Sequence, residues 1–202
     1  MLASKGKLLR VYTQNIDGLE VLAELPPDKI VECHGHFRTA ACIDCAKSAD
    51  IDSVVQSITK EGKAPTCDKC KGYVKPDIVF FGEGLPNRFH KLLRPDLQQA
   101  DLLIILGTSL QVAPVSMIPD LVNRNVCKRV LLNRELVGNL DILGKTNKQN
   151  KKLQQDIFHK GDCDDAIVTL SQLMGWDDEL QELHTKTRVN LKMKQEQNNK
   201  KN

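Results

Sequence analysis

Four cysteines stand in two closely spaced pairs, Cys42-x-x-Cys45 and Cys67-x-x-Cys70, and 21 residues separate the pairs. Two thiolates on one tight turn grip a single metal ion, and two such turns supply four soft ligands in a tetrahedron, as a structural zinc ion requires. A site closed by four sulfur atoms leaves no open position for water, so it organises structure and does no chemistry itself. The spacing therefore predicts one structural zinc ion, with any catalysis elsewhere in the chain.

Other uses of paired cysteines fit the sequence less well. A thioredoxin-like redox site needs only one such pair. A nucleic-acid-binding zinc ribbon needs a basic surface, whereas residues 41–70 hold four lysines against five acidic residues. Three further cysteines, Cys33, Cys127 and Cys163, bring the count to seven, an odd number that favours free thiols in a reducing, intracellular compartment.

Polar residues follow each of five short apolar runs, and they are the candidates for catalysis and ligand binding. These sets are Thr13–Gly18, Cys33–His36, Gly107–Ser109, Asn133–Glu135 and Gly161–Asp164. His34 is a candidate general base, because imidazole is neutral near physiological pH. The Gly-Thr-Ser set allows close backbone approach and suits a phosphate or a ribose, and Glu135 could accept hydrogen bonds from ribose hydroxyls.

Each set also has an ordinary structural explanation. A His-Gly pair is more often part of a turn, Gly-Thr-Ser is more often a helix cap, and Asn or Asp after a strand commonly forms a turn. Asn15 and Asp17, which could orient a polar substrate group or a water, are open to that explanation too. The functional interpretation gains weight because all five sets fall at one edge of one predicted sheet.

The elements that must position these residues alternate between strands and helices. We predict buried strands at Lys7–Tyr12, Lys29–Glu32, Asp101–Leu106, Arg129–Asn133 and Asp156–His159, and helices at Arg88–Gln99, Pro114–Asn123, Asp164–Met174 and Asp177–Thr187. The alternation is typical of an α/β fold with a doubly wound parallel sheet, in which ligands bind outside the carboxyl ends of the strands. Helical spacing of Ile51, Val54, Val55 and Ile58 predicts one short helix between the cysteine pairs, and residues 144–155 predict a surface loop.

Composition argues against two classes of partner. The net charge is +3, but residues 186–202 alone hold six Lys or Arg and one Glu, so the rest of the chain is close to neutral and does not demand nucleic acid. No apolar run approaches the ~20 residues that cross a bilayer, and the first ten residues lack the apolar stretch of a secretory signal. The tail, 189–202, is polar, and we expect it to be disordered.

Several segments together resemble the sirtuins, the NAD-dependent protein lysine deacylases. Besides the two cysteine pairs, they are Tyr12–Glu20, His34-Gly35, Lys75–Pro86, Gly107–Val112, Leu132–Glu135 and Gly161–Asp164. Their order and spacing match the family from about Gly6 to about His184. The resemblance is strongest to the eukaryotic cytosolic, nuclear and mitochondrial deacetylases.

The resemblance implies a Rossmann-like catalytic domain formed by residues 1–41 and 71–188, with a zinc-binding module, 42–70, inserted in it. It implies an NAD-dependent protein-lysine deacetylase, which releases nicotinamide and O-acetyl-ADP-ribose. In that reaction the acetyl-lysine oxygen attacks the nicotinamide ribose, and His34 acts as general base on a ribose hydroxyl. The implied cofactors are NAD and one zinc ion. The implied partners are acetylated proteins, histones among them, with no direct binding of nucleic acid or membrane, in the nucleus, cytoplasm or mitochondrion.

The resemblance also assigns ligand contacts residue by residue. Asn15 and Asp17 join His34 in the catalytic set and shape the nicotinamide pocket. The implied NAD contacts are Gln14, Asn15, Ile16, Asp17, Gly107, Thr108, Ser109, Asn133, Arg134, Glu135 and Cys163. A peptide would add as a strand to the edge formed by Val79, Phe80, Phe81, Gly82 and Glu83, with Val112 nearby and with Val79 and Phe81 beside the acetyl-lysine tunnel.

Two departures from the family pattern bear on these expectations. Cys33 and His36 stand where the family usually has Ala and Thr or Ser, but the glycine after His34 favours His34 over His36 as the base. The Gly-Ala-Gly phosphate loop and the Pro-Asp-Phe-Arg motif of sirtuins do not occur, and the chain has no G-x-G-x-x-G pattern. We therefore expect an N-terminally truncated sirtuin, and the alternative function is a catalytically impaired, zinc-stabilised protein-interaction module.

Overall fold

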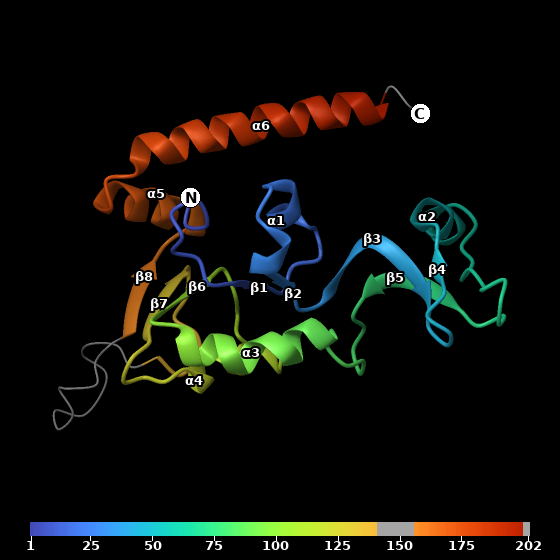
Figure 1. Ribbon diagram of the computed structural model, residues 1–202, viewed down its shortest axis with the longest axis horizontal. Coiled ribbons are helices and arrows are strands. Elements are labelled where there is room, and N and C mark those ends of the chain that lie inside the picture. Colours follow the sequence, from blue (N-terminus) through green and yellow to red (C-terminus); the bar gives the residue numbers. More distant parts are fainter. Residues whose placement is uncertain (141–155, 200–202) are drawn as a thin grey trace. The chain divides into compact units, whose positions relative to one another are not determined.

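The computed structural model describes residues 1–140 and 156–199, which form two compact units (Figure 1). One unit is Arg10–Leu93. The other combines Met1–Leu9 with the chain from Arg94 onward. Helix α3, Asn87–Gln99, contributes residues to both units.

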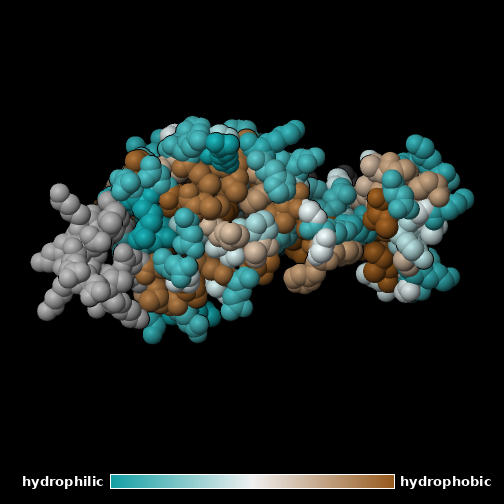
Figure 2. Space-filling view, turned by 90° about the horizontal axis from the view of Figure 1, so that it is seen from below, coloured by the Kyte–Doolittle hydropathy of each residue, from teal (hydrophilic) through white to brown (hydrophobic). Residues whose placement is uncertain are grey.

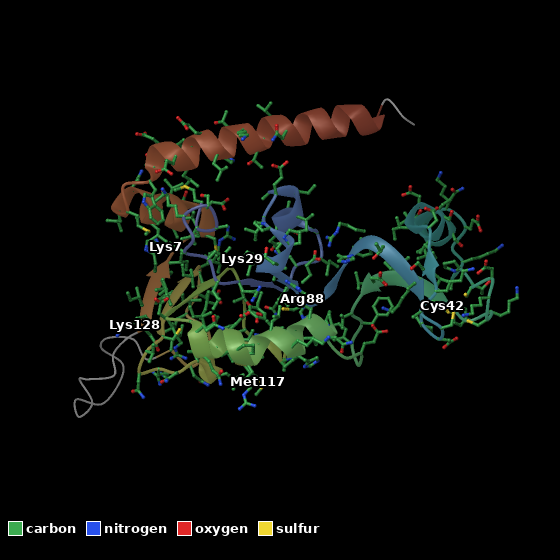
Figure 3. All side chains as sticks on the ribbon, viewed as in Figure 1. Lys7, Lys29, Cys42, Arg88, Met117 and Lys128 are labelled. Atoms are coloured by element: carbon green, nitrogen blue, oxygen red, sulfur yellow. The ribbon has the colours of Figure 1, made fainter. Side chains whose placement is uncertain are left out.

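The unit Arg10–Leu93 begins with a pair of short parallel strands, β1 (Val11–Thr13) and β2 (Ile30–Glu32). Between them lie the single-turn helix α1 (Leu19–Leu22) and a 3-10 helix (Pro27–Lys29). Arg88 of α3, labelled in Figure 3, lies near the turn before β2. Its guanidinium holds that turn, because it donates to the carbonyl of Ile30 at 2.8 Å and to the carbonyls of Pro27 and Asp28 at 3.0 and 2.9 Å. These bonds fix the strand that leads directly to His34.

An antiparallel sheet forms the rest of this unit. Its order is β4 (Ser48–Ala49), β3 (Gly35–Cys42) and β5 (Val74–Ile78). Helix α2 (Ile51–Thr59) packs beside it and begins at Asp50, whose carboxylate accepts the amide of Ser53 at 2.9 Å. The core is small and consists of Ala40, Cys42, Val54, Cys67 and Val74. The helix predicted from four apolar residues is confirmed, although Val55 and Ile58 are exposed.

The second unit is built on a parallel sheet with strands in the order β6 (Leu102–Leu106), β7 (Lys128–Asn133) and β8 (Asp156–Lys160). A 3-10 helix (Val115–Met117) and α4 (Ile118–Leu121) connect β6 to β7. Helix α5 (Cys163–Leu173) packs against β7, and α6 (Asp177–Asn199) follows α5. Leu131, on the central strand, is fully buried, and a burial of this kind is worth roughly 1.5–3 kcal/mol.

A buried ion pair joins the starts of β7 and β8. Arg129 Nε donates to Asp156 Oδ1 at 2.8 Å, and a second guanidinium nitrogen binds Oδ2. The remaining N–H groups donate to the carbonyls of Pro119 at 2.8 Å and Asn139 at 3.1 Å. The hydrogen bond to Asp156 raises the pKa of Arg129, so the pair stays charged inside the protein. It fixes the register of the two strands, because a shift would leave a charge buried alone.

The observed fold is the expected Rossmann-like α/β fold with an added module that carries four cysteines. The parallel strands are divided between the β1–β2 pair and the β6–β7–β8 sheet, whereas one sheet was predicted. The five predicted strands are present, although the first begins at Val11 rather than Lys7 because residues 1–8 form a hydrogen-bonded turn. The loop predicted at 144–155 lies outside the described residues.

The C-terminal end differs from the expected disordered tail. Helix α6 continues beyond Thr187 to Asn199, so residues 189–199 are helical. No Gly or Pro interrupts this stretch, and its Lys, Gln, Glu, Leu and Met residues have high helix propensity. A polar composition therefore did not exclude regular structure here. In the described part of the chain, no helix combines the length and apolar composition needed to cross a bilayer.

Candidate functional site

The four paired cysteines converge at one end of the β3–β5 sheet. Their sulfur atoms all lie within 4.8 Å of one another, and Figure 3 shows sulfur atoms gathered at Cys42. Sγ of Cys42 lies 3.4 Å from Sγ of Cys70, and Sγ of Cys45 lies 3.8 Å from Sγ of Cys67. A zinc ion with four bonds of about 2.3 Å to sulfur in a tetrahedron separates the sulfur atoms by roughly 3.8 Å. The arrangement therefore fits the predicted zinc ion.

The two cysteine turns have the same backbone form. In the first, the amide of Ala46 donates to the carbonyl of Cys42 at 3.0 Å, and the amide of Cys42 donates to the carbonyl of Lys47 at 2.9 Å. In the second, the amides of Lys71 and Cys67 make the equivalent bonds at 2.9 and 2.7 Å. Ala46 and Lys71 both adopt a left-handed conformation, with φ of 55° and 65°. Each of the two similar turns directs its two thiols toward the same point. A metal site formed by four sulfur atoms requires this arrangement.

The protonation of the cysteines also differs within the cluster. The amide of Cys45 stabilises the thiolate of Cys42 and lowers its pKa to about 7. The amide of Gly72 lowers the pKa of Cys70, but the neighbouring thiols outweigh it and raise that pKa to about 12. One thiol therefore gives up its proton readily while another holds it, and a bound cation would deprotonate both.

The exposed surface of this module is partly apolar. Ile43, Val55, Ile58 and Tyr73 are exposed there, and Figure 2 shows apolar side chains at the right-hand end of the view, where the module lies.

An ion pair joins the two cysteine turns. Lys47 Nζ lies 2.7 and 2.8 Å from the two carboxylate oxygens of Asp68. The ion pair lowers the pKa of Asp68 and raises that of Lys47.

His34 lies at the other end of β3, in the turn that joins it to β2. Its Nδ1 lies 3.0 Å from the carbonyl oxygen of Gln14, at the end of β1. Because a carbonyl oxygen only accepts, Nδ1 carries the proton, and Nε2 is the nitrogen that can accept one. The amide of Val79 donates to the carbonyl of His34 at 2.9 Å. The structure therefore brings Gln14, His34 and Val79 together and gives His34 the tautomer of a general base.

Gly35 explains why a glycine follows His34. Its φ is +74°, and a Cβ atom built on it would lie 2.0 Å from the carbonyl oxygen of Asp77. At this point β3 starts against β5, with Gly35 opposite Ile78. Any side chain here would push the two strands apart and move the backbone of His34.

Replacing Gly35 with alanine is therefore expected to lower the free energy of unfolding by roughly 2–4 kcal/mol, because it adds a backbone clash to a left-handed φ. Urea denaturation followed by circular dichroism measures this loss. Gly62→Ala is the matched control, since Gly62 has a φ of +65° and no heavy atom within 4 Å of its ideal Cβ. It should cost only about 1 kcal/mol. Equal losses in the two variants would contradict the role of the clash.

Asn15 and Asp17 lie in the segment after β1 and are exposed. The amide of Asn15 donates to Thr13 Oγ1 at 3.2 Å, and the amide of Leu19 donates to Asp17 Oδ1 at 3.1 Å. Asp17 therefore stabilises the start of α1 by accepting this hydrogen bond. This is the ordinary structural role that the sequence allowed as an alternative to ligand binding. The side chain of Asn15 remains the candidate for ligand contact.

His36 has surroundings unlike those of His34. Its Nε2 lies 3.9 Å from Glu32 Oε2, and Glu32 is bound by both terminal nitrogens of Arg38 at 2.7 and 2.5 Å. The hydrogen bonds from Arg38 lower the pKa of Glu32 and raise that of Arg38. His36 thus neighbours a charged pair, whereas His34 contacts a neutral carbonyl.

The proposed peptide edge, Val79–Glu83, continues directly from β5. Phe81 is 99% exposed and Phe80 is half-exposed. Glu83 Oε2 accepts the amide of Phe80 at 2.8 Å, and this bond together with nearby Lys75 lowers the pKa of Glu83. Sequence reasoning missed Lys75, which lies 3.1 Å from Glu83. Lys75 lies in β5 and Glu83 in the turn after it, so neither helix nor strand periodicity could have identified the pair.

In the other unit, the side chain of Asn133 forms hydrogen bonds that link the segments after the carboxyl ends of β6 and β7. Asn133 Nδ2 donates to the carbonyl of Thr108 at 3.1 Å and to that of Glu135 at 2.8 Å. The Oγ1 atom of Thr108 accepts the amide of Leu110 at 3.0 Å, so this hydroxyl shapes its own turn. Ser109 and Glu135 are exposed beside this junction. The predicted residues of β6 and β7 are therefore brought together at one edge.

The end of β8 joins the same edge. Cys163 Sγ donates to the carbonyl of Leu132 at 3.3 Å, and a Cβ on Gly107 would lie 3.3 Å from that sulfur. Asp162 begins α5, but its carboxylate accepts Arg134 Nε at 2.6 Å instead of a helix amide. This hydrogen bond lowers the pKa of Asp162 and raises that of Arg134. Val112, the remaining residue predicted to contact the substrate peptide, is exposed and belongs to this unit. The predicted peptide edge, Val79–Glu83, belongs to the unit Arg10–Leu93.

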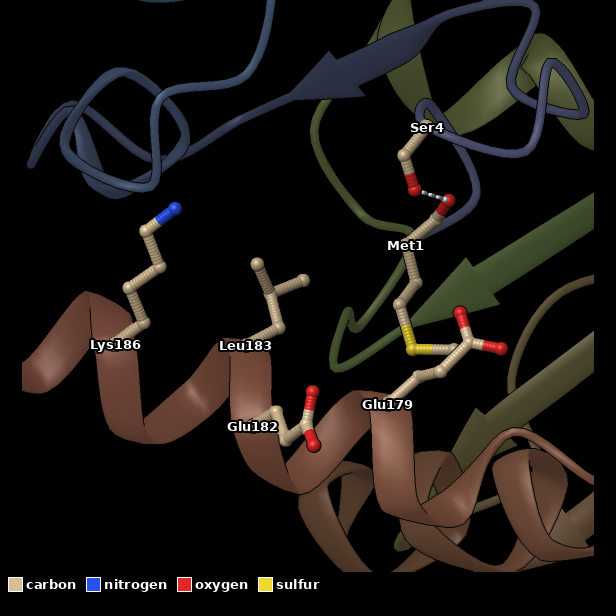
Figure 4. A pocket seen from close by; sticks show the side chains of 6 residues that line it. All are labelled: Met1, Ser4, Glu179, Glu182, Leu183 and Lys186. Carbon is tan, nitrogen blue, oxygen red and sulfur yellow. Dashed lines mark hydrogen bonds between the residues drawn. The ribbon is translucent and has the colours of Figure 1, made fainter.

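A separate groove lies between the N-terminal turn and α6. It is lined by Met1, Ser4, Glu179, Glu182, Leu183 and Lys186 (Figure 4). Lys5 holds the turn in place, because its Nζ lies 2.7 Å from Glu179 and 4.9 Å from the centre of the Trp176 ring. None of the candidate catalytic or binding residues lines this groove.

Comparison with known proteins identifies the chain's relatives. The model of the Sir2 family matches residues 1–114, more than half of the chain. The chain belongs to the Sir2 family. The matched region includes the four cysteines, His34 and the segment Val79–Glu83.

Named relatives of this Sir2-family chain are NAD-dependent protein deacetylases. It is 42% identical to sirtuin-2 of Danio rerio over 192 residues, to HST2 of Candida albicans over 189 and to sirtuin-3 of Mus musculus over 191. The matches cover 91%, 94% and 95% of this chain, and 50%, 54% and 54% of the respective relatives. The chain thus spans about half the length of the curated relatives it matches.

Proposed function

We propose that this chain is the catalytic portion of an NAD-dependent protein-lysine deacetylase that acts on acetylated proteins, with histones as one candidate class. The observation that carries the proposal is the fixed tautomer of His34, whose Nδ1 faces the carbonyl of Gln14 at 3.0 Å. It leaves Nε2 ready to accept a proton, as a general base must. Membership of the Sir2 family and the deacetylase relatives support the same function.

NAD, when bound, supplies the ribose hydroxyls and the nicotinamide leaving group of this reaction. We assign His34 the role of taking a proton at Nε2. Asn15 and Asp17, with Gln14 and Ile16 beside them, would orient the nicotinamide end. In the other unit, Gly107, Thr108, Ser109, Asn133, Arg134, Glu135 and Cys163 would meet the phosphates and adenosine, and their convergence at one strand edge suits that ligand.

The substrate lysine would be delivered by an extended peptide. We propose that the peptide pairs with the edge Val79–Glu83 and that Val79 and Phe81 flank the acetylated side chain, and we also assign Val112 to substrate binding. The exposure of Phe81 supports this assignment, because an unburied aromatic side chain is a good anchor for a partner.

We propose that one zinc ion, held by Cys42, Cys45, Cys67 and Cys70, has a structural role in a module formed by residues 42–70. Residues 1–41 and 71–188 would form the catalytic domain. Thiolate ligands persist in a reducing compartment, and we therefore propose the nucleus, cytoplasm or mitochondrion as the location.

The test of this function is nicotinamide release by the 202-residue chain incubated with NAD and an acetyl-lysine peptide. Release should require both compounds and should be absent with the same peptide lacking the acetyl group. Mass spectrometry of the peptide should show loss of the acetyl mass in step with the release. No release by folded, zinc-loaded protein would overturn the proposal for this chain.

A further inference from the structure

Three side chains form a brace across the turn that follows β5. Lys75 Nζ donates to the carbonyl of Ile78 at 2.5 Å, lies 3.1 Å from Glu83 Oε2, and sits 4.7 Å from the centre of the Phe80 ring. Glu83 in turn accepts the amide of Phe80 at 2.8 Å and donates its own amide to the carbonyl of Phe80 at 3.0 Å. We call Lys75, Phe80 and Glu83 the Lys75 brace.

The brace decides which groups of the turn face a partner. Phe80 lies under the ammonium of Lys75, whereas its neighbour Phe81 is 99% exposed. The amide of Phe80 is taken by Glu83, so an added strand would pair with other backbone groups of Val79–Glu83. Gly82 has a φ of +90°, which closes the turn and lets Glu83 reach back. Loss of Lys75 would remove the ammonium from both Glu83 and Phe80 and leave the turn held by the two hydrogen bonds between those residues.

The position of the brace gives it a role in binding rather than in the core. The side chains of Lys75 and Glu83 are 22% and 40% exposed, so their attraction is partly screened and adds little to global stability. Lys75 nevertheless makes three contacts within one turn. A side chain of this kind mainly limits the number of conformations that a surface segment adopts.

We infer that Lys75 is a positioning residue for the acyl-peptide edge, holding Val79–Glu83 in the form that an extended acetyl-lysine peptide binds. The inference rests on the proposed function, because it assigns Lys75 to the same peptide site. An edge that is already ordered does not lose that conformational freedom when the peptide binds. Lys75 therefore affects peptide affinity, while the chemical step depends on other residues.

The test compares Lys75→Met with the unsubstituted chain, because methionine keeps an unbranched side chain and removes the ammonium. The Kd for a fluorescent acetyl-lysine peptide, measured by anisotropy, and the KM for that peptide should both rise roughly three- to tenfold, whereas kcat changes less than twofold. Lys75→Arg should restore most of the affinity. Lys91→Met, at an exposed position on α3, should leave Kd and KM unchanged.

A second measurement does not depend on the proposed function. Limited chymotrypsin digestion should cut Lys75→Met at Phe80 or Phe81 several times faster than the unsubstituted chain, because the unbraced turn opens more often. Unchanged peptide affinity and unchanged cleavage would overturn the inference. Faster cleavage with unchanged affinity would leave a structural brace and overturn its role in binding. If the unsubstituted chain itself binds no acetyl-lysine peptide, the proposed function fails, and the peptide role of Lys75 fails with it.

Discussion

Cys67→Ser is expected to abolish zinc binding and unfold the module between the cysteine turns. Cys67 is buried, and its sulfur lies 3.8 Å from that of Cys45 and within 4.8 Å of the other two. The free energy of zinc binding in such sites is on the order of 10 kcal/mol, far more than a core of five small side chains supplies. Metal analysis should show one zinc ion per unsubstituted chain and close to none in the variant.

The control for this experiment is Cys127→Ser. Cys127 is equally buried, but it lies in the other unit and outside the four-sulfur cluster. It should retain one zinc ion per chain even if its thermal stability falls. A full zinc content in Cys67→Ser, or none in fresh reduced protein without substitutions, would refute the zinc assignment.

Loss of zinc should also affect the proposed active residues. Strand β3 runs from Gly35 to Cys42, with a shift in register against β5 between Gly35 and Ala40, and β5 runs from Val74 to Ile78, just before Val79. The cysteine turns close one end of these strands, and His34 with Val79 lies at the other end. Treatment with a chelator should therefore lower turnover along with the circular dichroism of the module, and added zinc should restore both.

His34→Ala is expected to reduce the rate of nicotinamide-coupled deacetylation roughly 10³-fold, the usual cost of removing a general base. The reason is the fixed position of the ring, in which Nδ1 donates to Gln14 and Nε2 is left to accept a proton. The binding of the acetyl-lysine peptide should change little, because Val79 reaches the backbone of His34 rather than its side chain. Steady-state kcat and peptide Kd, measured on the same preparation, separate the two effects.

His36→Ala is the matched control. His36 is two residues away and also on the β3 side of the turn, but it neighbours Glu32 and Arg38. Its removal should leave kcat within about threefold of the unsubstituted chain, since it is not placed as a base. If His34→Ala kept full activity while His36→Ala lost it, the roles of the two histidines would have to be exchanged.

Strands and helices with strong apolar periodicity were predictable from the sequence. The run Asp101–Leu106 corresponds to β6, and the segment Arg88–Gln99 corresponds to α3. Strands β3 and β5 were missed because neither has an apolar run. Three consecutive residues of β3, Phe37–Thr39, are exposed beside a shift in register, and β5 contains Pro76, which ordinarily argues against a strand.

The candidate residues were predictable as types, but their partners were not. The zinc cysteines follow from spacing alone, because each pair lies within one turn. The tautomer of His34 depends on Gln14, which is 20 residues away, and Lys75 contacts Glu83 across the turn after β5. The first contact forms only when β1 and β2 pair, and the second depends on the path of that turn, so local sequence patterns contain neither.

The guanidinium of Arg129 has a consequence for how the effect of a substitution spreads through this sheet. It binds the carbonyl of Asn139 and the carboxylate of Asp156 at once. One side chain near the start of β7 therefore anchors both a segment that lies beyond the end of that strand and the first residue of β8. A substitution of Arg129 should accordingly disturb β8 and, through it, the strand edge that carries Asn133 and Cys163.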